Sequence, residues 1–248
     1  MASRILLAAV LFLLAPFTQA KTWTVAPGAG TADFSSLHDA IAAAQPGDAL
    51  IVSSGIYQEP GGLVIDKSLT IICKQGTFTT RFMPLAAAPM DEPIALTIRD
   101  LAPGDLVHVS GLSLSSDTPP SAFSRSLLID NCAGQVILSE VNCLSGVGTI
   151  QSPATGIIRN STSVALDNCS FLPAATSQFG PRGQGALLVQ GSLVQINNSA
   201  IRGASGSSLA IADTNDGGPG IMAASSAIAS SKAFTCDFVE AKCFLATV

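Results

Sequence analysis

Four eight-residue stretches align without gaps: VHVSGLSL at 107–114, VILSEVNC at 136–143, VALDNCSF at 164–171 and VQINNSAI at 194–201. Their first residues are 29, 28 and 30 positions apart. In each stretch, apolar residues alternate with variable ones before and after the middle, which is the period of a strand with one buried face. The fourth and fifth places hold Ser, Asp, Asn, Glu or Gly, and such residues favour a sharp corner. Each stretch therefore predicts a strand, a two-residue corner and a second strand.

A further apolar run precedes each of the later stretches, at 127–129, 156–158 and 186–189. Three short strands per repeat form one coil of a β-solenoid, whose coils stack about 4.8 Å apart. The prediction is an all-β chain, a right-handed parallel β-helix with repeat coils of about 29 residues over 95–234 and a C-terminal segment at 235–248. The first Val of each stretch should form an inward ladder. A β-sandwich also has many short strands, but it does not explain one constant period.

Residues 21–73 differ in character and should hold a capping helix and the first coils. Apolar residues recur there at helical spacing, at Leu37, Ala40, Ile41 and Ala44. Asp33 precedes them as a candidate N-cap. A short helix here would cover the apolar end and unpaired strand edges of the first coil. Tyr57 and Glu59 are expected to fix the first corner of the solenoid.

The segment FSSLHDAIAAAQPGDALIVSSGIYQE at 34–59 resembles the start of pectin-lyase-like right-handed parallel β-helix proteins, a group that includes pectin methylesterases. Beyond this segment only the repeat pattern continues. The resemblance implies the fold, export and a carbohydrate context. The chain lacks the Gln-Asp-Thr and Asp-Phe-Ile-Phe-Gly motifs of the methylesterases, and the lyase and polygalacturonase motifs as well. The resemblance therefore carries over no catalytic residue.

The first twenty residues have the pattern of a signal peptide. Arg4 precedes an apolar run at 5–17, and Thr18-Gln-Ala20 is a small-x-small cleavage site before Lys21. The run is shorter than the ~20 residues that a membrane-spanning helix needs. We expect a signal peptide at 1–20, a β-helix domain at 21–248 without a transmembrane segment, and a secreted, periplasmic or extracellular location.

Charge and cysteine content limit the partners, disulfides and metal sites that the chain can have. Removing Arg4 from 12 basic and 17 acidic residues leaves 11 − 17, a net charge of −6 for the mature chain. Such a chain cannot neutralise phosphates, so nucleic acid is excluded as a partner. Export permits disulfides, and the neighbouring Cys236 and Cys243 are the favoured pair. Cys132, Cys143 and Cys169 are either bridged or buried as free thiols. No cluster with zinc-ligand spacing is present.

Loops that follow the repeats carry the candidate ligand-binding residues, because insertions in a solenoid cluster on one side and often bind ligands. These residues are Asp117, Arg125, Arg182, Asp213 and Asp216. The oxygen-rich run at 213–218 is a weak candidate for calcium, and a plain Asx/Gly turn is the favoured interpretation. No cofactor and no catalytic residue are assigned.

The sequence therefore favours an exported, non-catalytic module that binds or scaffolds a polysaccharide or a cell-surface component. The alternative is a carbohydrate-active enzyme, a lyase, hydrolase or esterase, with an unfamiliar site on the same loops. Paired carboxylates on the loop face would favour the enzyme, because glycoside hydrolysis needs two of them. A degenerate repeat protein without a ligand site is a third interpretation.

Overall fold

The computed structural model describes residues 19–28, 30–76, 79–85, 94–115, 125–144, 154–172 and 185–201, and two further strands at 221–224 and 227–230. The chain passes repeatedly through three parallel sheets in the order A, B, C, and every strand pairs with the equivalent strands of the coils on either side. The predicted right-handed parallel β-helix is therefore confirmed.

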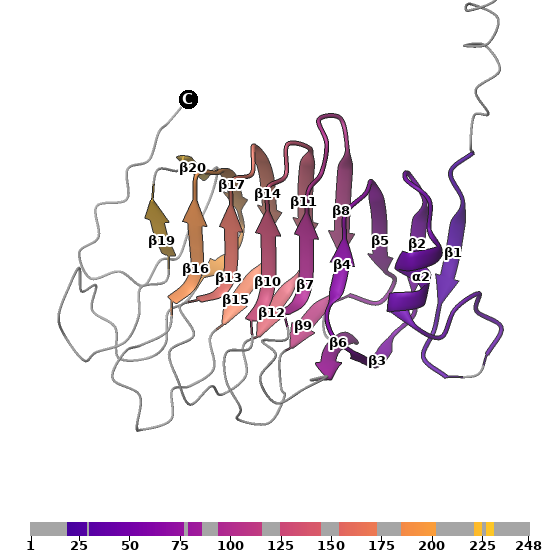
Figure 1. The fold of residues 1–248 in the computed structure, drawn as a ribbon. Helices are drawn as coiled ribbons and strands as arrows, with labels where there is room; N and C mark the ends of the chain where they lie inside the picture. The colour runs from indigo at the N-terminus through magenta and orange to yellow at the C-terminus, as the bar shows by residue number, and fades with distance from the viewer. Residues whose placement is uncertain are drawn as a thin grey trace, which may run out of the picture.

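Sheet A contains the first strand of each coil, and these strands pair in the order β1 (Thr22–Val25), β2 (Ala49–Val52), β5 (Leu69–Cys73), β8 (Leu106–Ser110), β11 (Gln135–Ser139), β14 (Ser163–Asp167), β17 (Leu193–Asn197) and β20 (Ala227–Ser230). Sheet B contains the second strands, β3 (Gly55–Pro60), β6 (Thr80–Leu85), β9 (Ser113–Ser115), β12 (Asn142–Leu144), β15 (Ser170–Leu172) and β18 (Ala200–Ile201). Sheet C contains the third, β4 (Leu63–Ile65), β7 (Ile94–Arg99), β10 (Arg125–Asp130), β13 (Ala154–Arg159), β16 (Gly185–Gln190) and β19 (Ile221–Ala224). Figure 1 shows these coils stacked along one axis, from β1 at one end to β19 and β20 at the other.

The inward valine ladder has the predicted register. Val107 pairs with Val136, Val136 with Val164, and Val164 with Val194. All four side chains are buried, with at most 2% of their surface exposed. His108 and Gln195, one place further on, lie half-buried and exposed on the outer face, as expected.

Two lines of left-handed residues form corners of the coils. Between sheets A and B the φ angles are +75° at Gly111, +54° at Glu140, +53° at Asn168 and +47° at Asn198, which confirms the predicted corner. The backbone N–H groups of Gly111, Glu140 and Asn168 still bond the next coil; that of Glu140, for example, donates to Asp167 O at 2.9 Å. A second such line, between sheets C and A, was not predicted; its residues are Asp100, Asn131, Asn160 and Gly191.

The residue after each corner is buried, and in the later coils it carries a hydroxyl or thiol, at Cys169 and Ser199 on one line and at Cys132, Ser161 and Ser192 on the other. Ser199 Oγ donates to Asn197 O and accepts the N–H of Cys169 at 3.0 Å. The Sγ of Cys169 lies 3.5 Å from Asp167 O, the equivalent carbonyl one coil earlier. At the corner between sheets C and A, the Cys132 N–H likewise donates to Ser161 Oγ, and Cys132 Sγ lies 3.4 Å from Asp130 O. In these ladders Cys therefore acts as a substitute for Ser.

The four cysteines that the structure describes, Cys73, Cys132, Cys143 and Cys169, are buried free thiols. Of the two alternatives for Cys132, Cys143 and Cys169, bridged or free, the structure therefore shows the free thiol. Burial raises the pKa of each thiol, in Cys169 to about 12. The predicted pair Cys236 and Cys243 lies outside the described residues.

The capping helix α2 (Leu37–Ala43) is present, and it packs its buried residues against β1 and β4. Its N-cap is Ser36 and not Asp33, so that prediction was wrong. The Asp33 carboxylate instead accepts hydrogen bonds from the N–H and hydroxyl of Thr24. Within the described residues, no helix is long and apolar enough to cross a membrane.

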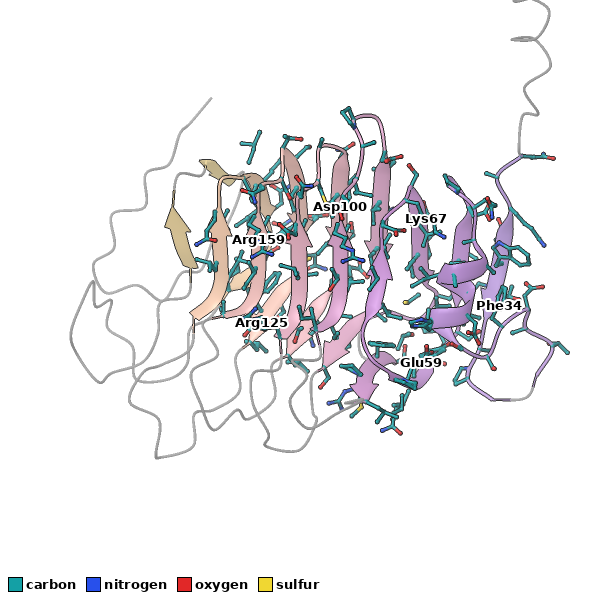
Figure 2. All side chains as sticks on the ribbon, in the orientation of Figure 1. Phe34, Glu59, Lys67, Asp100, Arg125 and Arg159 are labelled. Atoms are coloured by element: carbon teal, nitrogen blue, oxygen red, sulfur yellow. The ribbon has the colours of Figure 1, made fainter. Side chains whose placement is uncertain are left out.

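Glu59 completes the helix cap from a distant strand, as Figure 2 shows. Its carboxylate accepts from Leu37 N at 2.6 Å, His38 N at 2.8 Å and Ser36 Oγ at 2.9 Å. The Tyr57 hydroxyl donates to Ser53 O at 2.9 Å. Tyr57 and Glu59 thus fix the start of the solenoid, but Glu59 does so through α2 and not through a corner.

Candidate ligand face

Sheets B and C meet along the edge where the chain leaves for its long inserts. The strand ends that bound the inserts stack in register, as in the pairs Leu144–Leu172 in sheet B and Ala154–Gly185 in sheet C. Arg125 is the first residue of β10, and its partner is Ile94 at the start of β7. The inserts therefore begin and end along one edge of the molecule, which runs along the coil axis in Figure 1.

Of the five predicted ligand residues, the structure describes only Arg125. It is half-buried at the edge between the two sheets, as its label in Figure 2 shows. Asp117, Arg182, Asp213 and Asp216 lie outside the described residues, as does the candidate calcium segment at 213–218.

The outer face of sheet B carries a column of polar residues beside this edge. Arg81 pairs with Ser113, Ser113 with Asn142, and Asn142 with Ser170, one residue from each of four successive coils. Arg81 Nη2 also donates to Ser115 Oγ at 2.7 Å, so the guanidinium lies along the sheet. We call the set Arg81, Ser113, Ser115, Asn142 and Ser170 the polar column.

Sequence reasoning missed the polar column, although part of its signal was present. The seventh place of the repeat is Ser113, Asn142 or Ser170 in three of the four stretches, and it alternates with buried residues. Strand periodicity therefore places it outward. Arg81 lies before the first recognisable repeat, so only the pairing of β6 with β9 reveals that it belongs to the same column.

Asn142 is the most unusual member of the polar column. Its Oδ1 is buried and has no hydrogen-bond partner among the described residues. Leaving an acceptor unsatisfied costs about 1–3 kcal/mol. A water molecule or a ligand hydroxyl that donated to this oxygen would recover that free energy.

The start of each sheet C strand packs closely on sheet B. Small residues line this contact, in register from Ser126 of β10 to Thr155 of β13, and both are fully buried. The Ser126 hydroxyl donates to Leu144 O of β12, which joins the two sheets directly. This contact keeps Arg125, the neighbour of Ser126, beside the polar column.

Several carboxylates of the described coils are engaged in structural bonds. Asp105 accepts from Ser68 Oγ at 2.7 Å, and Asp130 pairs with Arg159 at 2.7 Å. His38 on α2 and His108 on sheet A are far apart in the fold. Within the described residues there is no group of three or more His, Cys, Asp or Glu side chains that could hold a metal ion.

No protein-family model and no curated protein matches the chain. Among solved structures, pectin methylesterase PemA from Erwinia chrysanthemi is similar at 12% identity, with 87% of this chain and 80% of that chain covered and a TM-score of 0.44. The Escherichia coli protein YbhC is similar at 11% identity, with 87% of this chain and 66% of that chain covered and a TM-score of 0.46.

A third similar structure is the PL6 family alginate lyase AlyGC, at 14% identity and a TM-score of 0.41. The match covers 86% of this chain but only 29% of the lyase. The coils themselves confirm the right-handed parallel β-helix that the resemblance at 34–59 implied, and the activities named in those structures stay with those proteins.

Proposed function

We propose that the mature chain is an exported β-helix protein that binds or scaffolds a polysaccharide without cleaving it. The observation that carries this proposal is the polar column, which sets equivalent polar residues in register on four successive coils beside the insert edge. Ser113 and Ser115 are buried, so the half-buried Arg81, Asn142 and Ser170 are the members that a ligand would contact. Coils repeat about every 4.8 Å, a rise comparable with the length of one sugar unit. A linear polysaccharide could therefore meet the same type of hydrogen-bonding group at each coil.

Charge and chemistry support the same proposal. The net charge of the mature chain is negative, which disfavours nucleic acid and anionic membranes. Asn142 offers a buried acceptor, and the serines of the polar column both donate and accept, as sugar hydroxyls do. Contacts would extend from the polar column onto the inserts that carry Asp117, Arg182, Asp213 and Asp216.

The test combines binding with activity. Mature protein is titrated by calorimetry with neutral and acidic polysaccharides, including methylated and unmethylated pectin. Asn142→Ala and Arg125→Ala should weaken binding at least about tenfold, which is 1.4 kcal/mol. Gln195→Ala is the matched control, because this exposed residue lies on sheet A away from the insert edge, and it should leave the affinity unchanged.

Activity is measured on the same substrates with and without calcium, by following unsaturated product, reducing ends and released methanol. No turnover is expected. Turnover that is lost in Asp117→Ala or Arg182→Ala would overturn the proposal in favour of a carbohydrate-active enzyme. Binding that survives substitution of Asn142, Arg125 and the four insert residues would place the ligand on another face.

A further inference from the structure

Asp48 is a buried carboxylate at the open end of the solenoid. Only 3% of its surface is exposed, and it accepts three hydrogen bonds, from Lys21 N at 2.7 Å, Gln45 N at 2.9 Å and Trp23 Nε1 at 3.0 Å. All three donors are N–H groups that are neutral in the intact chain. A buried carboxylate of this kind gains most from a positively charged donor.

The donor that lies nearest to the carboxylate belongs to the residue at which the mature chain is predicted to begin. Lys21 directly follows the cleavage site at 18–20, and Ala20 is exposed to solvent. The Lys21 carbonyl accepts Ala49 N at 2.8 Å, so Lys21 is already tied to β2. Its side chain lies over the Trp23 ring, with Nζ 3.1 Å from the ring centroid.

We propose that Asp48 is the binding site for the α-ammonium group that signal-peptide removal creates on Lys21. Hydrolysis of the Ala20–Lys21 peptide bond consumes one water, leaves a carboxylate on Ala20 and releases Lys21 N, which is protonated at neutral pH. The same nitrogen then donates to Asp48 Oδ1 as a charged group. A neutral backbone hydrogen bond becomes a buried ion pair, and no other contact of β1 needs to change.

The surroundings of Asp48 favour the charged form that this ion pair requires. Burial pushes the pKa of Asp48 up, but the hydrogen bonds from Lys21, Gln45 and Trp23, together with the positive charge of Lys21, outweigh it, so the pKa lies below its usual value. Asp48 is therefore ionised at neutral pH before cleavage. In the precursor the groups that donate to Asp48 are neutral and the Lys21 side chain acts on it only through space, whereas in the mature chain one donor is itself a cation.

Processing would therefore stabilise the fold at its first coil. The precursor, which must cross a membrane, would hold β1 and α2 less tightly than the exported protein does. This inference depends on cleavage before Lys21 and is independent of any ligand on the polar column.

The experiment compares three forms of the chain in the wild-type and Asp48→Asn backgrounds. They begin at Lys21 with a free amine, at Lys21 with an N-acetyl group, or at Ala20. Acetylation is the matched control, because it keeps the N–H donor and removes only the charge. With Asp48 present, the free amine should raise the thermal midpoint by about 2–4 °C over both other forms. In the Asp48→Asn background the three forms should melt together.

A second measurement covers the case in which Asp48→Asn does not fold. In the wild-type protein, the Lys21 α-amine is labelled with an amine-acylating reagent at pH 8 and quantified by peptide mapping. A buried ion pair should slow labelling of the α-amine at least about tenfold relative to the urea-unfolded chain. Equal labelling rates, or equal midpoints for the acetylated and free chains with Asp48 present, would overturn the proposal.

Discussion

The two ends of the described chain bury their polar groups by different means. In the cap region at 21–60, two carboxylates are buried, Asp48 and Glu59, and each serves one unrepeated set of donors. The repeat coils at 94–201 fully bury no charged side chain among the described residues; the polar side chains that they bury completely carry hydroxyls or thiols, such as Ser161, Ser199 and Cys169.

Repetition explains this difference. Any side chain of the repeat region has an equivalent about 4.8 Å away on the next coil, so a repeated carboxylate would face its own like charge. A hydroxyl both donates and accepts and can therefore be repeated from coil to coil. The Ser161 N–H donates to Ser192 Oγ, and the Cys132 N–H donates to Ser161 Oγ. At the cap there is no earlier coil, and a carboxylate can satisfy several donors at once.

The strongest test is to place a charge in the repeat region. Val164→Asp should lower the free energy of unfolding by more than about 4 kcal/mol, because an unpaired carboxylate would enter a dry ladder between Val136 and Val194. Chemical denaturation measures the loss. Ala165→Asp, one place on and facing outward, is the control and should cost far less. Similar losses from both would show that the register is wrong.

In the cap, removing a charge should destabilise the protein, whereas in the repeat region adding one should. Glu59→Gln keeps the size but replaces an acceptor oxygen by a donor that faces the N–H groups of α2. We expect a loss of about 2–3 kcal/mol, measured by chemical denaturation. Asp39→Asn, an exposed change on the same helix, is the control. If the loss is no greater than the control's, the cap does not rely on charge.

Within the repeat region, one coil departs from the pattern. Gly156 occupies the inward place held by Leu127 and Leu187 in the neighbouring coils, and a Cβ there would lie 2.8 Å from Phe171 Cε1. Gly156→Ala should therefore cost about 1–3 kcal/mol by overpacking. Phe171→Leu in the same chain should recover part of this loss in a double-mutant cycle, because the two sites share one space. Strict additivity would contradict that compensation.

The smallest loss of stability should come from replacing a cysteine of a hydroxyl and thiol ladder by serine. Cys169→Ser should cost less than about 1 kcal/mol, because Ser199 already makes the equivalent bonds one coil on. Cys143→Ser should cost more, because Cys143 pairs with Leu114 and Phe171 in an apolar ladder. Thermal melts compare the two variants, and equal losses would refute the distinction.

The Cys169 thiol should make the stability of the protein depend on pH. The pKa of Cys169 is raised by burial from 9.0 to about 12, so the folded protein keeps the thiol protonated where the unfolded chain ionises. Its contribution to stability is complete below pH 9 and is lost as the pH rises towards 12. Denaturation midpoints between pH 8 and 11 should fall less steeply in Cys169→Ser than in the wild type.

The sequence by itself determined the repeat, the inward valines and the corner at the fifth place. These are local properties, because strand period and the tolerance of Asn and Gly for left-handed backbone can be read from a few adjacent residues. It also located the cap helix to within a turn. It wrongly placed the N-cap at Asp33. Glu59 contacts Ser36 from 23 residues away and also accepts from the helix amides, and no local pattern predicts such contacts.

Only the tertiary structure decided which residues of different coils meet. The polar column joins Arg81 to Ser113 across the pairing of β6 and β9, and Gly156 makes room for Phe171 from another sheet. The bond from Lys21 N to Asp48 likewise spans 27 residues. Such contacts depend on coil register and on the volume left by neighbours, which are properties of the stacked solenoid and not of any one repeat.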